Sequence, residues 1–241
     1  MRAIFLADAH LRNPDDANYR ALLEFLDAQK GRIDLLALLG DICEFMVGLP
    51  DGVFPPYRPL FDLLADLQRN GTQLVYVEGN HDFHLARYFD RNLPCRVFPD
   101  HGAIDLDGRR VLLEHGDLAN PHDRGYRLLR GFWRSSALRL LIKLLPPGAT
   151  WAIGQNACSV SRQRRPRRSD DPRPARDILL PYARHRLAEG YDVMVTGHFH
   201  QPFREKIGSG ELLALGDWIE QFSYAVWEDG AFRLERFTPR G

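Results

Sequence analysis

The sequence predicts a layered α/β fold, in which helices cover buried strands. Short runs rich in Ile, Val and Leu recur along the chain, and each is followed at once by polar or glycine-containing residues, which is typical of buried strands. Segments with apolar residues at helical spacing lie between them. With 241 residues, 44% of them hydrophobic and 27% charged, the chain can form one large core. We therefore expect a single domain over residues 1–241.

The expected elements follow from these runs. Strands are predicted at residues 3–7, 33–39, 74–77, 111–113 and 191–195. Helices are predicted at residues 19–29 and 59–68, where leucines recur every three or four positions. The tail contains three further strand-like runs at residues 211–215, 223–227 and 232–237, with a Glu-Asp-Gly turn before the last. This pattern predicts a β-meander at the end of the chain.

Bulk composition limits the classes of protein that fit. The chain has no run of about 18 apolar residues, so no membrane-spanning helix is expected. Asp8 and His10 interrupt the N-terminus before an apolar signal segment is complete, which favours a cytoplasmic protein. The cysteines, Cys43, Cys95 and Cys158, are far apart. We expect reduced thiols, with neither a disulfide framework nor a zinc-thiolate site.

One stretch departs from the overall charge balance. The net charge is zero, yet residues 124–169 contain no Asp or Glu and eleven Lys or Arg, so the remainder sums to −11. Residues 124–145 are apolar and basic at helical spacing, and residues 146–174 are rich in Pro and Arg. We expect a helical lid insertion at about residues 122–178, between two core strands, that meets an anionic partner.

Metal-capable side chains follow the predicted strands. The blocks are Asp8-Ala9-His10, Gly40-Asp41, Gly79-Asn80-His81-Asp82, His115-Gly116-Asp117 and Gly197-His198-Phe199-His200. In open α/β sheets, ligands gather at the carboxyl ends of strands, so these blocks can converge on one site. Any one block alone would more often be a turn or a capped helix start, but five in order favour a functional metal site. Oxygen and imidazole donors favour Mn, Fe, Zn or Mg over copper(I) or an iron–sulfur cluster.

In these five blocks the sequence resembles the calcineurin-like metallophosphoesterases over residues 1 to about 201. The resemblance implies an αββα sandwich and two divalent metal ions, with Mn²⁺ favoured. It implies that the first ion is held by Asp8, His10, Asp41 and His200. It implies that the second ion is held by Asp41, Asn80, His115 and His198, so that Asp41 bridges both ions.

Two cations so placed can activate water, polarise phosphoryl oxygens and offset charge in an in-line displacement at phosphorus. His81 is adjacent to Asn80 and is expected to act as a catalytic residue, by donating a proton to the leaving oxygen or stabilising the developing charge. Asp82 is expected to orient it. A purely structural role for His81, as a partner of the metal ligands, remains an alternative.

Within that superfamily the chain is similar to UDP-2,3-diacylglucosamine pyrophosphatases, which are peripheral membrane enzymes of lipid A biosynthesis. Residues 40–45, read Gly-Asp-Ile-Cys-Glu-Phe, resemble that family's motif, and His115-Gly116-Asp117 is followed by Asp123, Tyr126 and Arg130. The resemblance implies cleavage of UDP-2,3-diacylglucosamine to lipid X and UMP at the cytoplasmic face of the inner membrane. The substrate-binding residues implied are Asn80, His81, Asp123, Tyr126, Arg130 and His198.

The lid insertion suits an amphiphilic nucleotide-sugar lipid. Apolar residues of 124–145 alternate with basic ones, as in an interfacial amphipathic helix. A following arginine cluster could attract an anionic membrane surface; it consists of Arg162, Arg164, Arg165, Arg167 and Arg168. The alternative is a core-packing helix followed by a disordered basic loop.

His81 departs from the pyrophosphatase pattern, which carries Arg at this position. This difference keeps open a more generic phosphodiesterase acting on a nucleotide or nucleic-acid phosphodiester. A nuclease is disfavoured, because the insertion offers few aromatic residues for stacking with bases. A scaffold protein without activity is disfavoured too, because all seven implied metal ligands are present.

Overall fold

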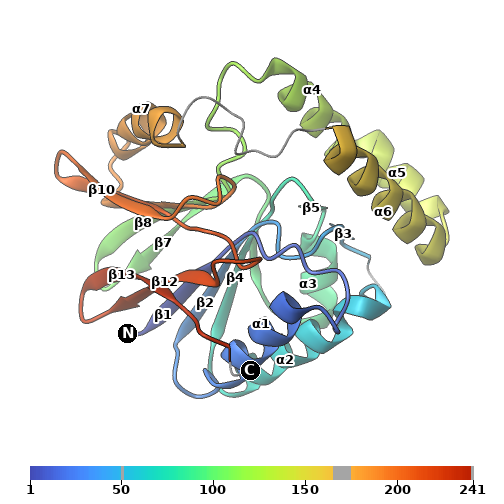
Figure 1. The fold of residues 1–241 in the computed structure, drawn as a ribbon, viewed down its shortest axis with the longest axis horizontal. Helices are drawn as coiled ribbons and strands as arrows, with labels where there is room; N and C mark the ends of the chain where they lie inside the picture. The colour runs from blue at the N-terminus through green and yellow to red at the C-terminus, as the bar shows by residue number, and fades with distance from the viewer. Residues whose placement is uncertain (50–51, 165–174, 240–241) are drawn as a thin grey trace.

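The structure is a computed structural model that describes residues 1–49, 52–164 and 175–239. Two sheets face each other, and helices cover the outer face of each (Figure 1). One sheet has six strands in the order β13-β12-β1-β2-β4-β6, and the other has five in the order β10-β11-β9-β8-β7. This arrangement confirms the predicted αββα sandwich.

The six-stranded sheet is built from β1 (Ala3–Leu6), β2 (Leu35–Leu39), β4 (Gln73–Val77), β6 (Arg96–Phe98), β12 (Ser223–Glu228) and β13 (Ala231–Arg236). The five-stranded sheet contains β7 (His101–Leu106), β8 (Arg109–Glu114), β9 (Val193–Thr196), β10 (Phe203–Ile207) and β11 (Gly210–Ala214). A short pair, β3 (Met46–Val47) and β5 (Asp82–Phe83), stands apart. The helices are α1 (Ala17–Asp27), η1 (Pro55–Tyr57), α2 (Arg58–Arg69), α3 (Ala86–Asn92), α4 (Arg124–Trp133), α5 (Ser136–Leu144), α6 (Pro147–Arg164) and α7 (Ala175–Leu187).

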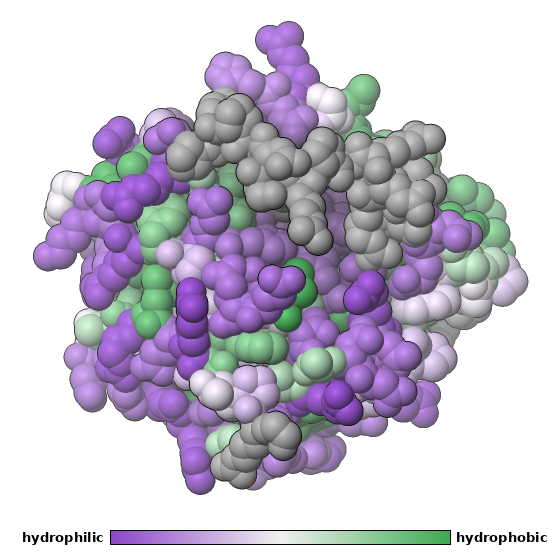
Figure 2. Space-filling model, in the orientation of Figure 1, coloured by the Kyte–Doolittle hydropathy of each residue, from purple (hydrophilic) through white to green (hydrophobic). Residues whose placement is uncertain are grey.

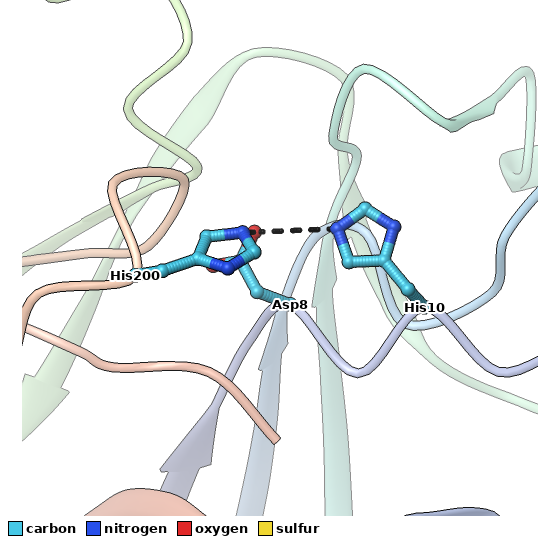
Figure 3. Close-up of side chains that lie close together, drawn as sticks. All are labelled: Asp8, His10 and His200. Atoms are coloured by element: carbon cyan, nitrogen blue, oxygen red, sulfur yellow. Dashed lines mark ion pairs between the residues drawn. The ribbon is translucent and has the colours of Figure 1, made fainter. Parts of the chain in front are cut away.

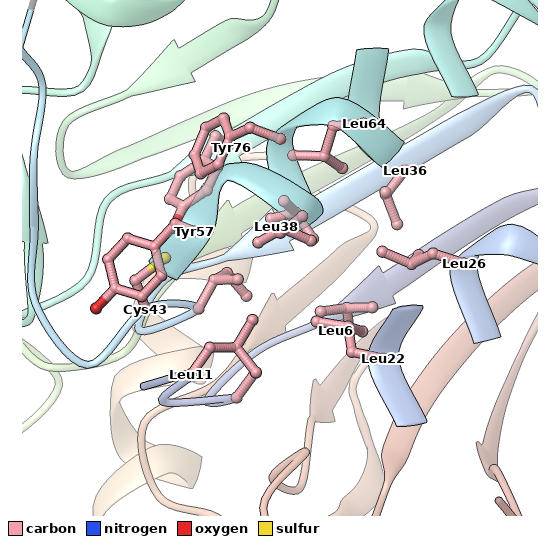
Figure 4. Close-up of a cluster of buried hydrophobic side chains, with 14 of the residues drawn as sticks. Leu6, Leu11, Leu22, Leu26, Leu36, Leu38, Cys43, Tyr57, Leu64 and Tyr76 are labelled. Atoms are coloured by element: carbon pink, nitrogen blue, oxygen red, sulfur yellow. The ribbon is translucent and has the colours of Figure 1, made fainter. Parts of the chain in front are cut away.

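Strand β1 shows how the layers form. Successive side chains of a strand point to opposite faces of the sheet. Ile4 and Leu6 therefore pack outward against α1 and α2, in the cluster that Figure 4 shows in part. Ala3 and Phe5 point inward, where they join residues of both sheets in the central core. A third apolar cluster lies between the five-stranded sheet and α7. Both faces of each sheet are thus covered, which explains why the inner strands are apolar throughout.

The predicted β-meander at the end of the chain is wrong. Strand β11 pairs with β9 and β10 in the five-stranded sheet, whereas β12 and β13 form a hairpin that adds to β1 in the other sheet. The connection between β11 and β12 passes the carboxyl end of β1, where the backbone N–H of Trp218 donates to the carbonyl of Asp8 at 3.1 Å. The change of sheet rests on this long-range contact, which local turn signals do not reveal.

The segment between β8 and α7 contains α4, α5 and α6, which project beside the loops at one edge of the sheets (Figure 1). Ser135 ends the first helical stretch and caps α5, because its hydroxyl accepts the backbone N–H of Leu138 at 3.1 Å. Helix α6 occupies residues 147–164, so this part of the Pro- and Arg-rich stretch is helical. Trp151 anchors α6 on the rings of Phe54 and Tyr57.

One sequence expectation in this segment falls partly outside the described residues. Arg165, Arg167 and Arg168 of the predicted arginine cluster lie outside the described residues. The boundaries of the lid insertion and the single-domain organisation stay predictions. Among the described helices, none is long and apolar enough to cross a bilayer.

Candidate metal centre

Five loops at the carboxyl ends of β1, β2, β4, β8 and β9 bring the predicted ligands together. Several of these residues have left-handed backbone conformations, including Asp8 (φ 54°), Asp41 (φ 53°) and His200 (φ 55°). This conformation costs free energy for residues other than glycine, and it clusters at functional sites, where the surrounding structure holds it in place. The sharp turns aim side chains from successive strands at one point.

The first group of side chains comprises Asp8, His10 and His200. In the view of Figure 3 the His200 ring overlaps the Asp8 carboxylate, and the His10 ring lies to the right, joined to that carboxylate by a dashed line. The Asp8 Oδ1 atom lies 3.3 Å from His200 Nε2 and 4.0 Å from His10 Nε2. His10 Nε2 also lies 3.6 Å from Asp41 Oδ2. The carboxylate oxygens and imidazole nitrogens therefore face one another across a shared space.

The second group comprises Asp41, His115 and His198. His115 Nε2 lies 3.5 Å from Asp41 Oδ2, 3.3 Å from Asn80 Oδ1 and 3.2 Å from His198 Nδ1. Asp41 therefore faces both groups. His81 belongs to a third overlapping group with His10 and Asp41, and its Nε2 lies 4.0 Å from Asp41 Oδ2.

The carboxylates of Asp8 and Asp41 indicate that cations fit between these side chains. Each uses one oxygen to hold a neighbouring loop: His198 N donates to Asp8 Oδ2 at 2.7 Å, and His81 N donates to Asp41 Oδ1 at 2.9 Å. The other oxygen of each, Asp8 Oδ1 and Asp41 Oδ2, is buried without a hydrogen-bond partner among the described residues. Buried anionic oxygens are costly unless a cation compensates them. Oxygen atoms with several imidazoles around them form a donor set that suits a divalent metal.

Backbone carbonyls orient two of the imidazoles. His115 Nδ1 lies 2.8 Å from the carbonyl of Leu39, and His81 Nδ1 lies 2.8 Å from the carbonyl of Glu44. A carbonyl only accepts, so each Nδ1 carries the hydrogen and each Nε2 is turned to the centre. Such outer contacts fix the tautomer of a metal-binding histidine. His200 is supported on its other side by Asp217, whose Oδ2 lies 3.8 Å from His200 Nδ1.

The pKa values reflect the concentration of negative charge. Burial lowers the pKa of His115, but Asp41, Asp8 and Asp117 outweigh burial and raise it to about 10. Burial tends to raise the pKa of Asp41, yet the surrounding imidazoles hold it well below its ordinary value. A proton on His115 therefore offsets part of this negative charge, whereas burial lowers the pKa of His10 to about 3. Metal binding at such a centre releases protons, because ligands bind in their deprotonated forms.

Asp82 connects two of the five loops that carry the predicted metal ligands. Its buried carboxylate accepts the backbone N–H of Ile42, next to Asp41, at 3.3 Å. It also accepts the N–H of Gly79, next to Asn80, and the hydroxyl of Tyr76 at 2.5 Å. Burial, followed by the charge of Asp41, raises the pKa of Asp82 to about 6. The prediction that Asp82 orients His81 is not tested by these contacts, which hold the loop backbones.

Glycines allow the loops to approach each other. A Cβ atom on Gly79 would collide with the Asp41 side chain, and one on Gly197 would lie 2.7 Å from Asp8 Oδ2. The glycines of the sequence blocks therefore have a packing reason: the backbone passes directly against a carboxylate.

The predicted substrate-binding residues of the lid insertion make contacts within the protein. Asp123 caps α4 by accepting the N–H of Tyr126 at 2.9 Å. The Tyr126 hydroxyl donates to Asp117, and Arg130 donates to Asp117 at 2.7 Å and to Asp100 at 2.6 Å. These contacts place Tyr126 and Arg130 beside the loop that follows His115. Their role in binding substrate stays a prediction.

Two residues that support the centre, Tyr76 and Asp217, were not anticipated from sequence, and a third, Glu44, appeared there only as part of the motif at residues 40–45. Tyr76 lies inside an apolar strand, where a tyrosine is an ordinary core residue. Its hydrogen bond to Asp82 is seen only in the structure. Asp217 follows β11, and the same criterion of polar residues after a strand could have found it. The Glu44 side chain lies 3.8 Å from His10 Nδ1, a contact that only the folded loop reveals.

We predict that Asp82→Asn weakens metal binding. The amide nitrogen of Asn would face backbone donors, so one loop loses its acceptor. We expect about a tenfold loss of Mn²⁺ affinity by calorimetric titration and a fall of about 1–3 kcal/mol in the free energy of unfolding by urea denaturation. Exposed Asp90→Asn serves as the control. Unchanged Mn²⁺ affinity in Asp82→Asn would contradict the role given to this carboxylate.

Comparison with known proteins agrees with this geometry. The family model of the calcineurin-like phosphoesterases matches residues 1–202. The UDP-2,3-diacylglucosamine hydrolase of Aeromonas salmonicida is 33% identical, covering 99% of this chain and 94% of the relative. That of Stenotrophomonas maltophilia is 32% identical and covers 98% of each chain.

Among solved structures, an archaeal phosphodiesterase superposes with a TM-score of 0.51 at 11% sequence identity, covering 98% of this chain and 99% of the other, a similarity of fold. The family match extends over all five ligand loops, and the side chains of those loops form a cluster suited to divalent metal ions. The chain therefore belongs to the calcineurin-like phosphoesterase family and is a metal-dependent phosphohydrolase.

Proposed function

We propose that this protein hydrolyses the pyrophosphate bond of UDP-2,3-diacylglucosamine, releasing UMP and lipid X. The observation that carries the proposal is the extent of similarity to the hydrolases of that name. It covers 99% of this chain and 94% of the Aeromonas salmonicida protein, and so it includes the lid insertion as well as the metal loops. A shared insertion is expected if both proteins accommodate the same amphiphilic molecule.

The centre would hold two divalent ions, with Mn²⁺ favoured and Fe, Zn or Mg as alternatives. Asp8, His10, Asp41 and His200 would hold one ion. Asp41, Asn80, His115 and His198 would hold the other. Bound there, the ions would supply an activated water and a positive charge beside the phosphoryl oxygens.

His81 is the candidate catalytic residue beside the ions. Its Nδ1–H is engaged by the Glu44 carbonyl at 2.8 Å, so only Nε2 can exchange a proton with a substrate. In the imidazolium form Nε2 donates a proton or a hydrogen bond to a phosphate oxygen. In the neutral form it accepts one. His81 replaces the arginine of the pyrophosphatase pattern. A generic phosphodiesterase is therefore the alternative function.

A parallel assay separates these functions. Protein loaded with Mn²⁺ is incubated with UDP-2,3-diacylglucosamine, a nucleotide phosphodiester and single-stranded DNA, and products are measured by mass spectrometry. We expect UMP and lipid X from the first substrate, at a rate at least about 100-fold above the other two, because the lid insertion adds binding to the lipid only in that case. Turnover of either other substrate without UMP from the first would contradict the proposal.

His81→Ala is the matched variant for this assay. It should retain Mn²⁺, measured by elemental analysis, and should lose about 100-fold or more in turnover. Full turnover with full metal content would remove His81 from the mechanism.

The lid insertion is also the proposed membrane contact. Its large apolar side chains are unusually exposed, including Leu128 (79%), Leu144 (74%) and Phe132 (58%). In the view of Figure 2, apolar residues gather at the right-hand edge, near the position of α5 in Figure 1. Exposed apolar side chains beside basic ones suit an anionic bilayer surface. We therefore propose peripheral attachment to the cytoplasmic face of the inner membrane.

Vesicle flotation tests this attachment. Wild-type protein should float with vesicles containing anionic phosphatidylglycerol, and less with neutral phosphatidylcholine. The double variant Leu128→Glu, Leu144→Glu should lose about tenfold or more of its partitioning, because it buries less apolar surface and adds negative charge. Ala231→Glu, exposed on the β12–β13 hairpin, is the control. Equal partitioning of all three proteins would show that the lid insertion is not the membrane contact.

A further inference from the structure

The carboxyl end of helix α4 is fastened to the loop that carries Asn80 and His81. Arg134, which follows the last residue of α4, donates through Nη1 to Glu78 Oε2 at 2.8 Å. Its Nη2 donates to the carbonyl of Gly79 at 3.0 Å. One guanidinium therefore holds both a side chain and the backbone immediately before Asn80. Only arginine offers two donors in a fixed planar fork of this kind.

Glu78 extends this connection across the loop. Its second oxygen, Oε1, accepts the backbone N–H of Leu85 at 2.6 Å. The carboxylate thus links the residue before the loop to the residue after it. Between these two points lie Gly79, Asn80, His81 and Asp82. Burial raises the pKa of Glu78 to about 7, and Arg134 opposes that rise.

Both charged groups are withdrawn from solvent. The Glu78 side chain is 3% exposed and that of Arg134 is 15% exposed. Beside them, the ring of Trp133 packs on that of Phe83 with centroids 5.5 Å apart. Removing one member of a shielded ion pair is more costly than removing a surface charge, because the remaining charge stays buried.

Helix α4 has several polar contacts with the core besides those of Arg134. Tyr126 and Arg130 bind Asp117, Arg130 also binds Asp100, and Arg127 donates to the carbonyl of Leu118 at 2.7 Å. These contacts hold the helix to the loop after β8. Of these residues, only Arg134 contacts the loop after β4. Its loss is therefore expected to affect that loop.

We propose that Arg134 is a positioning residue for the metal centre: its contacts with Glu78 and Gly79 hold Asn80 and His81 in place and couple the lid insertion to the chemistry. This inference rests on the proposed ligand role of Asn80. It implies that the lid insertion does more than receive a lipid, because its base forms part of the support of the centre.

Five variants test the proposal: Arg134→Met, Arg134→Lys, Glu78→Gln, the double variant Arg134→Met with Glu78→Gln, and Arg124→Met as a control. Arg124 is exposed on the same helix, so its loss removes the same charge without touching the loop. The double variant removes both buried charges together, so it leaves no unpaired charge buried and is expected to be more stable than either single variant. Mn²⁺ affinity is measured by calorimetric titration well below the melting temperature. Turnover is measured with bis(4-nitrophenyl) phosphate, a small diester that has no lipid for the lid insertion to bind.

We expect Arg134→Met and the double variant to bind Mn²⁺ about tenfold more weakly than wild type. Their kcat on the small diester should fall by a similar factor with little change in KM. Arg134→Lys should restore less than half of the lost affinity on a logarithmic scale, since one ammonium group cannot reproduce the two-armed contact. Arg124→Met should match wild type.

Wild-type Mn²⁺ affinity in both Arg134→Met and the double variant would overturn the proposal. So would a change confined to KM for a lipid substrate, because Arg134 would then contact substrate instead of positioning the loop. The Mn²⁺ titration needs no substrate. Failure of UDP-2,3-diacylglucosamine hydrolysis would therefore contradict the proposed function and leave this test intact.

Discussion

Two buried carboxylates, Asp8 and Asp41, set the requirement that the rest of the molecule meets. Both are fully buried, and a carboxylate without compensation is costly to remove from water. The structure places imidazoles on several sides of the pair and directs one oxygen of each acid toward a common space. Two or more cations at that space would offset the cost. The centre is therefore unfavourable for folding alone and favourable for binding metal.

The fold makes this concentration of charge possible. Parallel strands in the middle of each sheet end at the same edge, and tight loops at that edge carry every proposed ligand. The loops are held to each other by hydrogen bonds from backbone N–H groups to the same acids, as between His198 and Asp8 or His81 and Asp41. The carboxylates thus fix the loops, and the loops bury the carboxylates. Asp82 and Arg134 add further hydrogen bonds to the backbone of these loops.

Much of this architecture could be predicted from sequence because it rests on local patterns. Apolar runs such as residues 35–39 identify inner strands, and the polar blocks after them identify the centre. The exchange of sheets between β11 and β12 was not predictable, because it depends on a loop packing against the distant end of β1. Tyr76 was not predictable for a similar reason, since its hydroxyl meets Asp82 only in the folded chain.

The lid insertion shows a second limit of sequence patterns. Alternating apolar and basic residues predicted helices correctly in residues 124–145, yet they could not show which arginines face solvent. In the structure Arg130 and Arg134 turn toward acids of the core, whereas Leu128 and Leu144 are exposed. For a helix of an isolated soluble domain this is an inverted pattern. It is the pattern expected when the apolar face awaits a lipid or a membrane.

The paired acids are proposed to hold two divalent ions, with Asp41 between them. Anomalous X-ray scattering from a crystal soaked in Mn²⁺ tests it most directly. Two peaks are predicted, one near Asp8, His10 and His200 and the other near Asn80, His115 and His198, with Asp41 adjacent to both. A single peak, or Mn²⁺ bound away from Asp41, would contradict it.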